Sequence, residues 1–170
     1  MKNLLIVEDV AEAREWLTAI ARDAFPQASI STAQTIAGAI AKVDERDWDM
    51  ALIDLGLPDG SGLDVIRRIR KSAPDTVCVV TTVLGEDAHI VAALSAGAQG
   101  YLLKGQPSAL IQRQLVQLQQ GMPALSPTIA RRIMEHFQCS VPVAAATEKL
   151  TGRELEVLTL VAKGLRNADA

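Results

Sequence analysis

The 170-residue sequence has little of what defines several common protein classes. Aromatic residues make up only 3% of it, so its core must be aliphatic and rich in alanine. Cys78 and Cys139 are too few and too far apart for a disulfide framework or a zinc site. No apolar run approaches the roughly 18 residues of a membrane helix, and no secretory leader precedes the first apolar run. We therefore expect a cytoplasmic protein that does not associate with a membrane.

A strong excess of one charge is also absent. The 17 Lys and Arg residues against 20 Asp and Glu residues give a net charge of -3. That balance differs from the basic character of a domain that coats nucleic acid. Hydrophobic residues make up 49% of the chain, which supports a buried core and argues against wholesale disorder. The length suits one full domain and a smaller second segment.

Five short apolar runs alternate with amphipathic segments through the first part of the chain. The expected strands cover residues 4–7, 28–33, 49–54, 77–82 and 100–104, and the expected helices cover residues 11–24, 35–46, 62–73, 86–96 and 107–120. Strands that alternate with helices indicate βαβ units and a parallel sheet. Five such units predict an α/β fold, a flavodoxin-like doubly wound sheet with strand order 2-1-3-4-5.

Polar side chains stand where four of these strands end. Glu8 and Asp9 follow the first strand, Asp54 closes the third, Thr82 closes the fourth, and Lys104 closes the fifth. In an open α/β sheet, ligands bind in the crevice beyond the carboxyl ends of the strands. We therefore expect these five side chains to converge on one crevice.

Three carboxylates in one crevice repel one another unless a cation lies among them. Oxygen ligands without His or Cys favour magnesium over zinc. We predict a Mg²⁺ site with Asp9 and Asp54 as direct ligands and with Glu8 acting through water. The backbone carbonyl of Gly56, two residues after Asp54, could complete the site.

A metal beside a carboxylate, with a lysine and a hydroxyl nearby, suits the formation of an aspartyl-phosphate. Asp54 would be the nucleophile, and Lys104 and Thr82 would neutralise phosphoryl oxygens together with the metal. Each residue alone has a simpler explanation: Asp54 could cap a turn before its Pro/Gly loop, and Lys104 could be an exposed strand end. Their joint occurrence, each at the end of a different strand, favours a functional site.

Residues 1–120 resemble the receiver domain of two-component response regulators. The matching stretches are Ile6-Val-Glu-Asp9, Leu52-Ile-Asp-Leu-Gly-Leu-Pro-Asp-Gly-Ser-Gly62, Val79-Val-Thr-Thr82 and Ala96-Gly-Ala-Gln-Gly-Tyr-Leu-Leu-Lys104. The resemblance implies that Asp54 accepts phosphate from a sensor histidine kinase. It also implies that Thr82 is the switch hydroxyl and that Tyr101 swings inward when Thr82 moves to the phosphate. The region of residues 86–120 would respond, and a homodimer would form on phosphorylation.

Two departures from the receiver pattern affect the expected chemistry. Gly105 follows Lys104 where many receivers have a cis proline, so we assume no cis bond. Gly56 and Leu84, two residues after Asp54 and Thr82, have no polar side chain to orient an attacking water. Our hypothesis is that steric access at these two positions governs spontaneous dephosphorylation. An unchanged lifetime of the phosphorylated form in Leu84→Asn would count against it.

The rest of the chain resembles two further pieces of a regulator. Residues 121–134 resemble the linker helix of NarL/FixJ-type regulators, and residues 150–167 resemble the opening of a LuxR-type helix-turn-helix. We predict a receiver at 1–120, a helical linker at 121–148, and at 149–170 a partial all-α helix-turn-helix without its recognition helix. DNA binding would then require the output domain of a longer regulator.

The leading hypothesis is a phosphorylation-controlled transcription regulator, and the alternative is a receiver that acts by protein contact without DNA binding. We expect a phospho-accepting switch rather than an enzyme. A haloacid-dehalogenase phosphatase needs a second Asp two residues after its nucleophile, where this chain has Gly56. The phosphate-binding motif of nucleotide hydrolases, GxxxxGK[ST], is absent from the sequence.

Overall fold

The computed structural model describes residues 1–83, 87–122, 124–125 and 127–140. The chain divides into two compact units, Met1–Ile133 and Met134–Ala170. Most of the sequence-based predictions fall within the described residues of the first unit. Leu84 and the segment predicted as a partial helix-turn-helix lie outside the described residues. The predicted limits of the receiver, the linker and the output segment remain a prediction.

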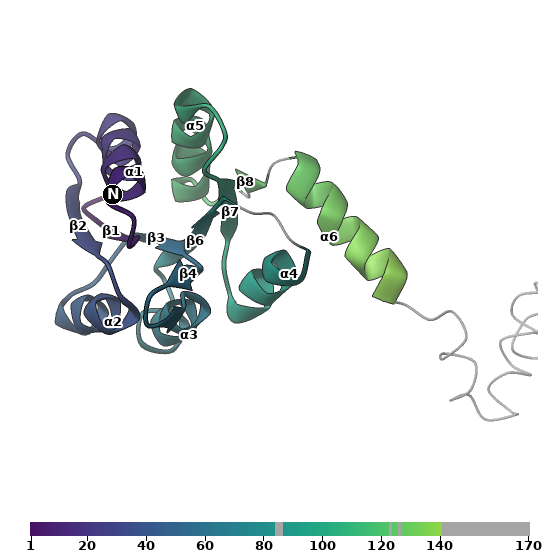
Figure 1. Ribbon diagram of the computed structural model, residues 1–170. Coiled ribbons are helices and arrows are strands. Elements are labelled where there is room, and N and C mark those ends of the chain that lie inside the picture. Colours follow the sequence, from purple (N-terminus) through teal and green to yellow (C-terminus); the bar gives the residue numbers. More distant parts are fainter. Residues whose placement is uncertain (84–86, 123, 126, 141–170) are drawn as a thin grey trace, which may run out of the picture. The chain divides into compact units, whose positions relative to one another are not determined.

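A single parallel sheet forms the centre of the first unit (Figure 1). Its order is β2-β1-β3-β6-β7-β8, and the strands are β1 (Asn3–Val7), β2 (Ser29–Ala33), β3 (Met50–Asp54), β6 (Val77–Thr82), β7 (Gly100–Leu103) and β8 (Ala124–Leu125). Two short antiparallel strands, β4 (Gly56–Leu57) and β5 (Gly60–Ser61), come after β3. The first five strands of the sheet have the predicted order, which confirms the flavodoxin-like fold.

Helices cover both faces of the sheet, as a doubly wound fold requires. They are α1 (Ala11–Ala24), α2 (Ile36–Glu45), α3 (Leu63–Ser72), α4 (Asp87–Ala96) and α5 (Ser108–Gln119). A further helix, α6 (Pro127–Ser140), follows β8. Figure 1 shows α1 and α5 on one face and α2, α3 and α4 on the other. Sequence signals explain several ends. The hydroxyl of Thr35 accepts a hydrogen bond from the Gly38 N–H at the start of α2, and Gly121, just beyond α5, has a φ of +77°.

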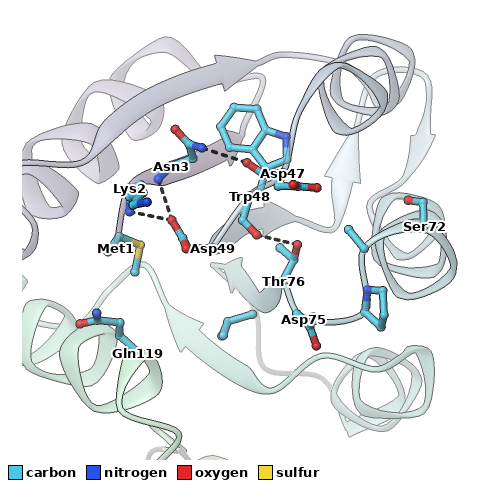
Figure 2. Close-up of a pocket in the computed structure, with 13 residues that line it drawn as sticks. Met1, Lys2, Asn3, Asp47, Trp48, Asp49, Ser72, Asp75, Thr76 and Gln119 are labelled. Atoms are coloured by element: carbon cyan, nitrogen blue, oxygen red, sulfur yellow. Dashed lines mark hydrogen bonds between the residues drawn. The ribbon is translucent and has the colours of Figure 1, made fainter.

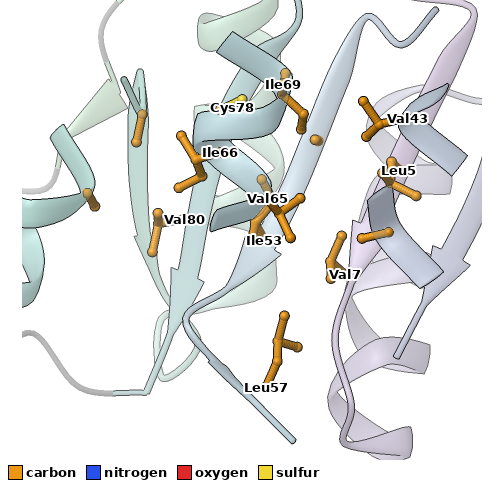
Figure 3. Packing of buried hydrophobic residues seen from close by; sticks show 14 of the residues in the cluster. Leu5, Val7, Val43, Ile53, Leu57, Val65, Ile66, Ile69, Cys78 and Val80 are labelled. Atoms are coloured by element: carbon orange, nitrogen blue, oxygen red, sulfur yellow. The ribbon is translucent and has the colours of Figure 1, made fainter. Parts of the chain in front are cut away.

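Alternation along the strands divides the core into two layers. The layer under α2, α3 and α4 includes Leu5, Val7, Ile53 and Val80 (Figure 3). Tyr101 belongs to the same layer. The layer under α1 and α5 includes Leu4, Ile6, Leu52, Val79 and Leu102. Both faces of the central strands are apolar because both are covered, and each fully buried aliphatic side chain contributes about 2 kcal/mol. The two layers fix the positions of the central strands and therefore of the polar residues at the carboxyl ends of those strands.

The sixth strand, β8, was not predicted. It pairs in parallel with β7, and Gly100 is opposite Ala124 and Tyr101 opposite Leu125. Two residues are too short for an alternating pattern, and an edge strand is fixed by its neighbour rather than by its own sequence. Past this strand, Ile129 of α6 is fully buried in the layer that contains Tyr101, and Ile133 packs against the same layer. The start of the predicted linker therefore belongs to the core of the first unit.

Candidate functional site

The carboxyl ends of β1, β3 and β7 bring Glu8, Asp54 and Lys104 together, as the sequence predicted. Val7 is opposite Ile53 in the sheet, so the next residues, Glu8 and Asp54, stand side by side. The Glu8 N–H donates to the Ala33 carbonyl at 2.9 Å and the Lys104 N–H to the Thr82 carbonyl at 2.8 Å. The hydrogen-bond ladder therefore runs one residue past β1 and β7 and holds the backbone of both residues in place.

Lys104 links the two acidic strand ends. Its Nζ atom lies 2.5 Å from Oε2 of Glu8 and 2.7 Å from Oδ1 of Asp54. Glu8 is fully buried, and the side chains of Asp54 and Lys104 are only 10% and 11% exposed. Buried charges persist only where they are paired, so this ammonium holds two carboxylates in a site largely shielded from solvent.

The pKa values of Glu8 and Lys104 are both raised, but for different reasons. Burial raises the pKa of Glu8, against the opposing effect of the nearby Lys104 ammonium. For Lys104, burial alone would lower the pKa, but hydrogen bonds to Asp54 and Glu8 outweigh it and the pKa is raised. The lysine is therefore a fixed positive charge at neutral pH.

Glu8, Asp9 and Asp54 each place a carboxylate oxygen within 4.8 Å of the others. Within the described chain, Oε1 of Glu8 is buried and makes no hydrogen bond of good geometry. Asp9 is exposed and can turn toward a cation from solvent. These three hard oxygen donors fit a magnesium ion, which binds one or two carboxylates and keeps several waters.

The loop after β3 is shaped to fit around Asp54. The Gly56 N–H donates to Oδ2 of Asp54 at 2.9 Å, which fixes the carboxylate opposite Lys104. Gly62 must be glycine, because a Cβ atom there would lie 2.0 Å from the Asp54 carbonyl oxygen. The Gly56 N–H thus has a defined role, while the predicted use of its carbonyl as a metal ligand remains a prediction.

A pocket of about 590 Å³ opens above these residues, and its wall includes Glu8, Asp9, Asp54, Gly56, Thr82 and Lys104. Thr82 is half-buried on this wall, whereas Tyr101 is 1% exposed and lies below it in the core. Val80 is opposite Tyr101, and Thr82 is opposite Leu103. Thr82 and Tyr101 therefore belong to neighbouring strands on the face that α4 covers, where a shift of one can affect the other.

Sequence reasoning did not identify two residues near the site. Arg14 donates from Nη1 to the carbonyl oxygens of Glu8 and Asp9 at 3.0 and 2.9 Å, which fixes the acidic loop to α1. His89, in the first turn of α4, lines the pocket beside Thr82. The only sequence signal for Arg14 was a cation soon after the acidic pair, and His89 had none because α4 is placed by tertiary packing.

A larger hollow of about 770 Å³ lies at the opposite ends of the strands (Figure 2). Its Asp49 carboxylate accepts the backbone N–H groups of Lys2 and Asn3 at 2.6 and 2.8 Å. The bond from Asn3 is the main reason that the pKa of Asp49 is lowered. The Thr76 hydroxyl donates to the Trp48 carbonyl at 2.7 Å. These hydrogen bonds connect the amino-terminal ends of the strands, so the polar groups of the hollow have a structural role. We therefore place the functional site at the carboxyl ends of the strands, around Glu8, Asp9 and Asp54, although the pocket there is smaller.

None of the helices in the described residues combines the length and the apolar character needed to cross a bilayer.

Comparison with known protein families identifies a response regulator receiver domain, which matches residues 4–115 of this chain. The transcriptional regulatory protein YdfI of Bacillus subtilis (strain 168) is 31% identical over 167 residues, which cover 98% of this chain and 78% of that protein. The acid tolerance regulatory protein ActR of Rhizobium meliloti (strain 1021) is 36% identical, and the match covers 92% of this chain and 81% of that protein.

Among solved structures, a LuxR-family two-component response regulator from Aurantimonas sp. SI85-9A1 is similar, with a TM-score of 0.72 and 26% identity. The match covers 79% of this chain and 96% of that structure. The fold, the cluster of Glu8, Asp9 and Asp54, and the similarity to these relatives all indicate the same family. The chain therefore belongs to the response regulators of two-component systems and carries their receiver domain.

Proposed function

We propose that this chain accepts a phosphoryl group on Asp54 from a sensor histidine kinase, with Mg²⁺ as cofactor, and so controls transcription through a DNA-binding output domain. One observation carries the proposal. At the open edge of the sheet, Lys104 and the Gly56 N–H hold the Asp54 carboxylate beside Glu8 and Asp9. Phosphoryl transfer needs this combination of a positioned nucleophile and charge neutralisation. The printed name of YdfI, a transcriptional regulatory protein, supports the role in transcription.

In the proposed step, an Asp54 carboxylate oxygen attacks the phosphorus of the kinase phosphohistidine. The new O–P bond forms as the P–N bond breaks, and the imidazole nitrogen leaves with the electron pair. Lys104, which pairs with Asp54, would pair with one phosphoryl oxygen, and the Thr82 hydroxyl would donate to another. A bound Mg²⁺ would supply positive charge among Glu8, Asp9 and Asp54. The chain is itself the phosphoryl acceptor and so acts as a switch rather than an enzyme.

Transfer to this chain can be tested with a phosphorylated histidine kinase or with acetyl phosphate, followed by intact mass spectrometry. We expect one added phosphoryl group when Mg²⁺ is present. Chelating the metal with EDTA should reduce the added mass to background. Equal labelling with and without Mg²⁺ would contradict the proposed site.

Magnesium binding can be measured separately from phosphorylation. Wild-type protein should unfold at a higher temperature as Mg²⁺ is added, because a ligand that binds only the folded state stabilises it. Asp9→Asn removes one proposed ligand and should weaken the apparent Mg²⁺ affinity by at least about tenfold. Asp23→Asn, at an exposed position of α1, is the matched control and should behave like wild type. Equal stabilisation of Asp9→Asn and wild type would remove Asp9 from the metal site.

We propose that the signal leaves the site through Thr82, Tyr101 and β8. Tyr101 is fully buried in the core layer that includes Ile129, and its backbone pairs with β8. A shift of Thr82 toward a phosphoryl group would alter the packing of Tyr101 and hence of the start of α6. The surface of α4, β7 and α5 would change as well, and we propose that this change promotes homodimer formation.

The contact between α6 and the core can be tested through stability. Ile129 is fully buried, so Ile129→Ala should lower the free energy of unfolding by about 2 kcal/mol or more. Met134, which is 57% exposed in the same helix, provides the control Met134→Ala. That control should change stability by no more than about 0.5 kcal/mol. Urea unfolding measures both, and an Ile129→Ala loss as small as that of the control would show that α6 is not packed on this core.

A further inference from the structure

Thr81 carries a buried hydroxyl without an evident structural purpose. The residue is 1% exposed, and its Oγ1 atom has no hydrogen-bond partner among the residues that the structure describes. Leaving a buried hydroxyl unpaired destabilises a fold, and valine would have the same shape without that cost. We therefore expect the Thr81 hydroxyl to form a hydrogen bond in another state of the molecule.

Strand alternation places Thr81 on the same face as the acidic site. Val79 belongs to the core layer under α1 and α5, so Thr81, two residues later, points to the same side. The three charged residues also come two positions after an apolar residue of that layer, so they point to the same side. The pairs are Leu52 and Asp54, Ile6 and Glu8, and Leu102 and Lys104. Thr82 points to the opposite face, so the two neighbouring hydroxyls serve different sides of the sheet.

The sheet order places Thr81 beneath the Lys104 side chain. Strand β6 lies between β7, which precedes Lys104, and β3, which carries Asp54. Thr81 is opposite Asp54 on one side and opposite Leu102 on the other. Strands are about 4.8 Å apart, so the lysine must cross the whole of β6 to reach Asp54 and then Glu8. On the face that Lys104 crosses, Thr81 is the residue of β6 level with Asp54.

We propose that Thr81 is a positioning residue for Lys104: its hydroxyl accepts a hydrogen bond from the Lys104 ammonium as the phosphoryl group is transferred to Asp54, and keeps it afterwards. This inference rests on the proposed phosphorylation of Asp54. In the structure the ammonium is divided between Glu8 and Asp54. When it turns to a phosphoryl oxygen, it gives up its contact with Glu8, and the Thr81 hydroxyl, on the same face of the neighbouring strand, would offer a replacement acceptor. The hydroxyl would thus hold the lysine in its phosphate-facing position.

The test compares wild type, Thr81→Val and Thr81→Ser. Valine keeps the shape and removes the hydroxyl, whereas serine keeps the hydroxyl. We expect Thr81→Val to be phosphorylated by acetyl phosphate about tenfold more slowly at saturating donor and Mg²⁺, the loss typical of a hydrogen bond to a charged group. The donor concentration for half-maximal rate should not change, and Thr81→Ser should recover most of the rate. Urea unfolding should show Thr81→Val to be at least as stable as wild type.

A second readout reports on the lysine directly. In the complex with beryllofluoride, a phosphoryl mimic, the ¹⁵N signal of the Lys104 ammonium should be protected from exchange in wild type and Thr81→Ser. It should be broadened in Thr81→Val. A Thr81→Val protein with wild-type rate and ammonium signal would overturn the inference alone. A rate loss that accompanies a loss of stability would also overturn it, by showing a structural role. Wild-type protein that forms no acyl phosphate would overturn the proposed function as well.

Discussion

Replacing Asp54 with asparagine is expected to abolish phosphoryl acceptance, with a loss of about a thousandfold or more in rate. Asparagine has nearly the same shape as aspartate and can still accept the Gly56 N–H, so the fold of the loop should persist. It has no nucleophilic carboxylate oxygen, and it lowers the negative charge beside Glu8. The loss should therefore be chemical rather than structural.

This first prediction is measured as the rate at which acetyl phosphate or a phosphorylated kinase adds mass to the chain in the presence of Mg²⁺. The control is Asp23→Asn, which makes the same chemical change at an exposed position and should be labelled like wild type. A circular dichroism spectrum and a thermal midpoint show whether Asp54→Asn is folded. Labelling of folded Asp54→Asn at more than a few per cent of the wild-type rate would assign the acceptor elsewhere.

Lys104→Met is expected to have the largest effect on stability. The substitution keeps an unbranched side chain of nearly the same length but removes the charge that Glu8 and Asp54 share. Removing one partner of a buried ion pair costs about 3 kcal/mol, because the remaining charge is left unpaired. Here two carboxylates are left, and one of them is fully buried. Urea unfolding without Mg²⁺ should show this loss in full.

Two signatures separate an electrostatic origin of that loss from a packing origin. Mg²⁺ should restore much of the stability of Lys104→Met, because a cation among the three carboxylates replaces the missing charge. Lowering the pH should also reduce the loss. The folded-state pKa of Glu8 is already raised above its ordinary value of 4.5, so the folded protein binds this proton more tightly than the unfolded chain does. Without Lys104 the pKa should rise further, and stability should increase as the pH falls through it.

The control for this second prediction is Lys71→Met, at an exposed position near the end of α3. It should change stability by no more than about 0.5 kcal/mol and should respond to neither Mg²⁺ nor pH in the manner of Lys104→Met. If Lys104→Met were as stable as wild type at neutral pH without Mg²⁺, the buried pairing would not be a feature of the protein in solution.

The sequence predicted the sheet because its strands are short apolar runs that end abruptly in charged or polar residues. Met50 to Ile53 are buried on both faces, and Asp54 comes directly after them. A central strand of a doubly wound sheet needs that pattern, so the strand order could be predicted along with it. The convergence of Glu8, Asp54 and Lys104 could be predicted from topology alone, because parallel strands place their carboxyl ends at one edge.

The features that were not predicted depend on packing partners that a linear pattern cannot specify. β8 has two residues and exists because β7 offers it an unpaired edge. Ile129 looked like one position of an amphipathic linker helix, and only the tertiary structure shows that it enters the core beside Tyr101. The direct pairing of Glu8 with Lys104 depends on how far a lysine reaches across the sheet. Thr81 and Thr82 are adjacent in sequence, and their opposite directions become informative only once the register is known.

The most direct test of the central claim is to locate the phosphoryl group. Wild-type protein is phosphorylated with acetyl phosphate and Mg²⁺, the acyl phosphate is reduced with borohydride, and the modified residue is identified by peptide mass spectrometry. The proposed function predicts that reduction converts Asp54, and Asp54 alone, to homoserine, and that the product is absent without Mg²⁺. Modification of Glu8, Asp9 or any other residue in its place, or labelling that does not require the metal, would contradict the account.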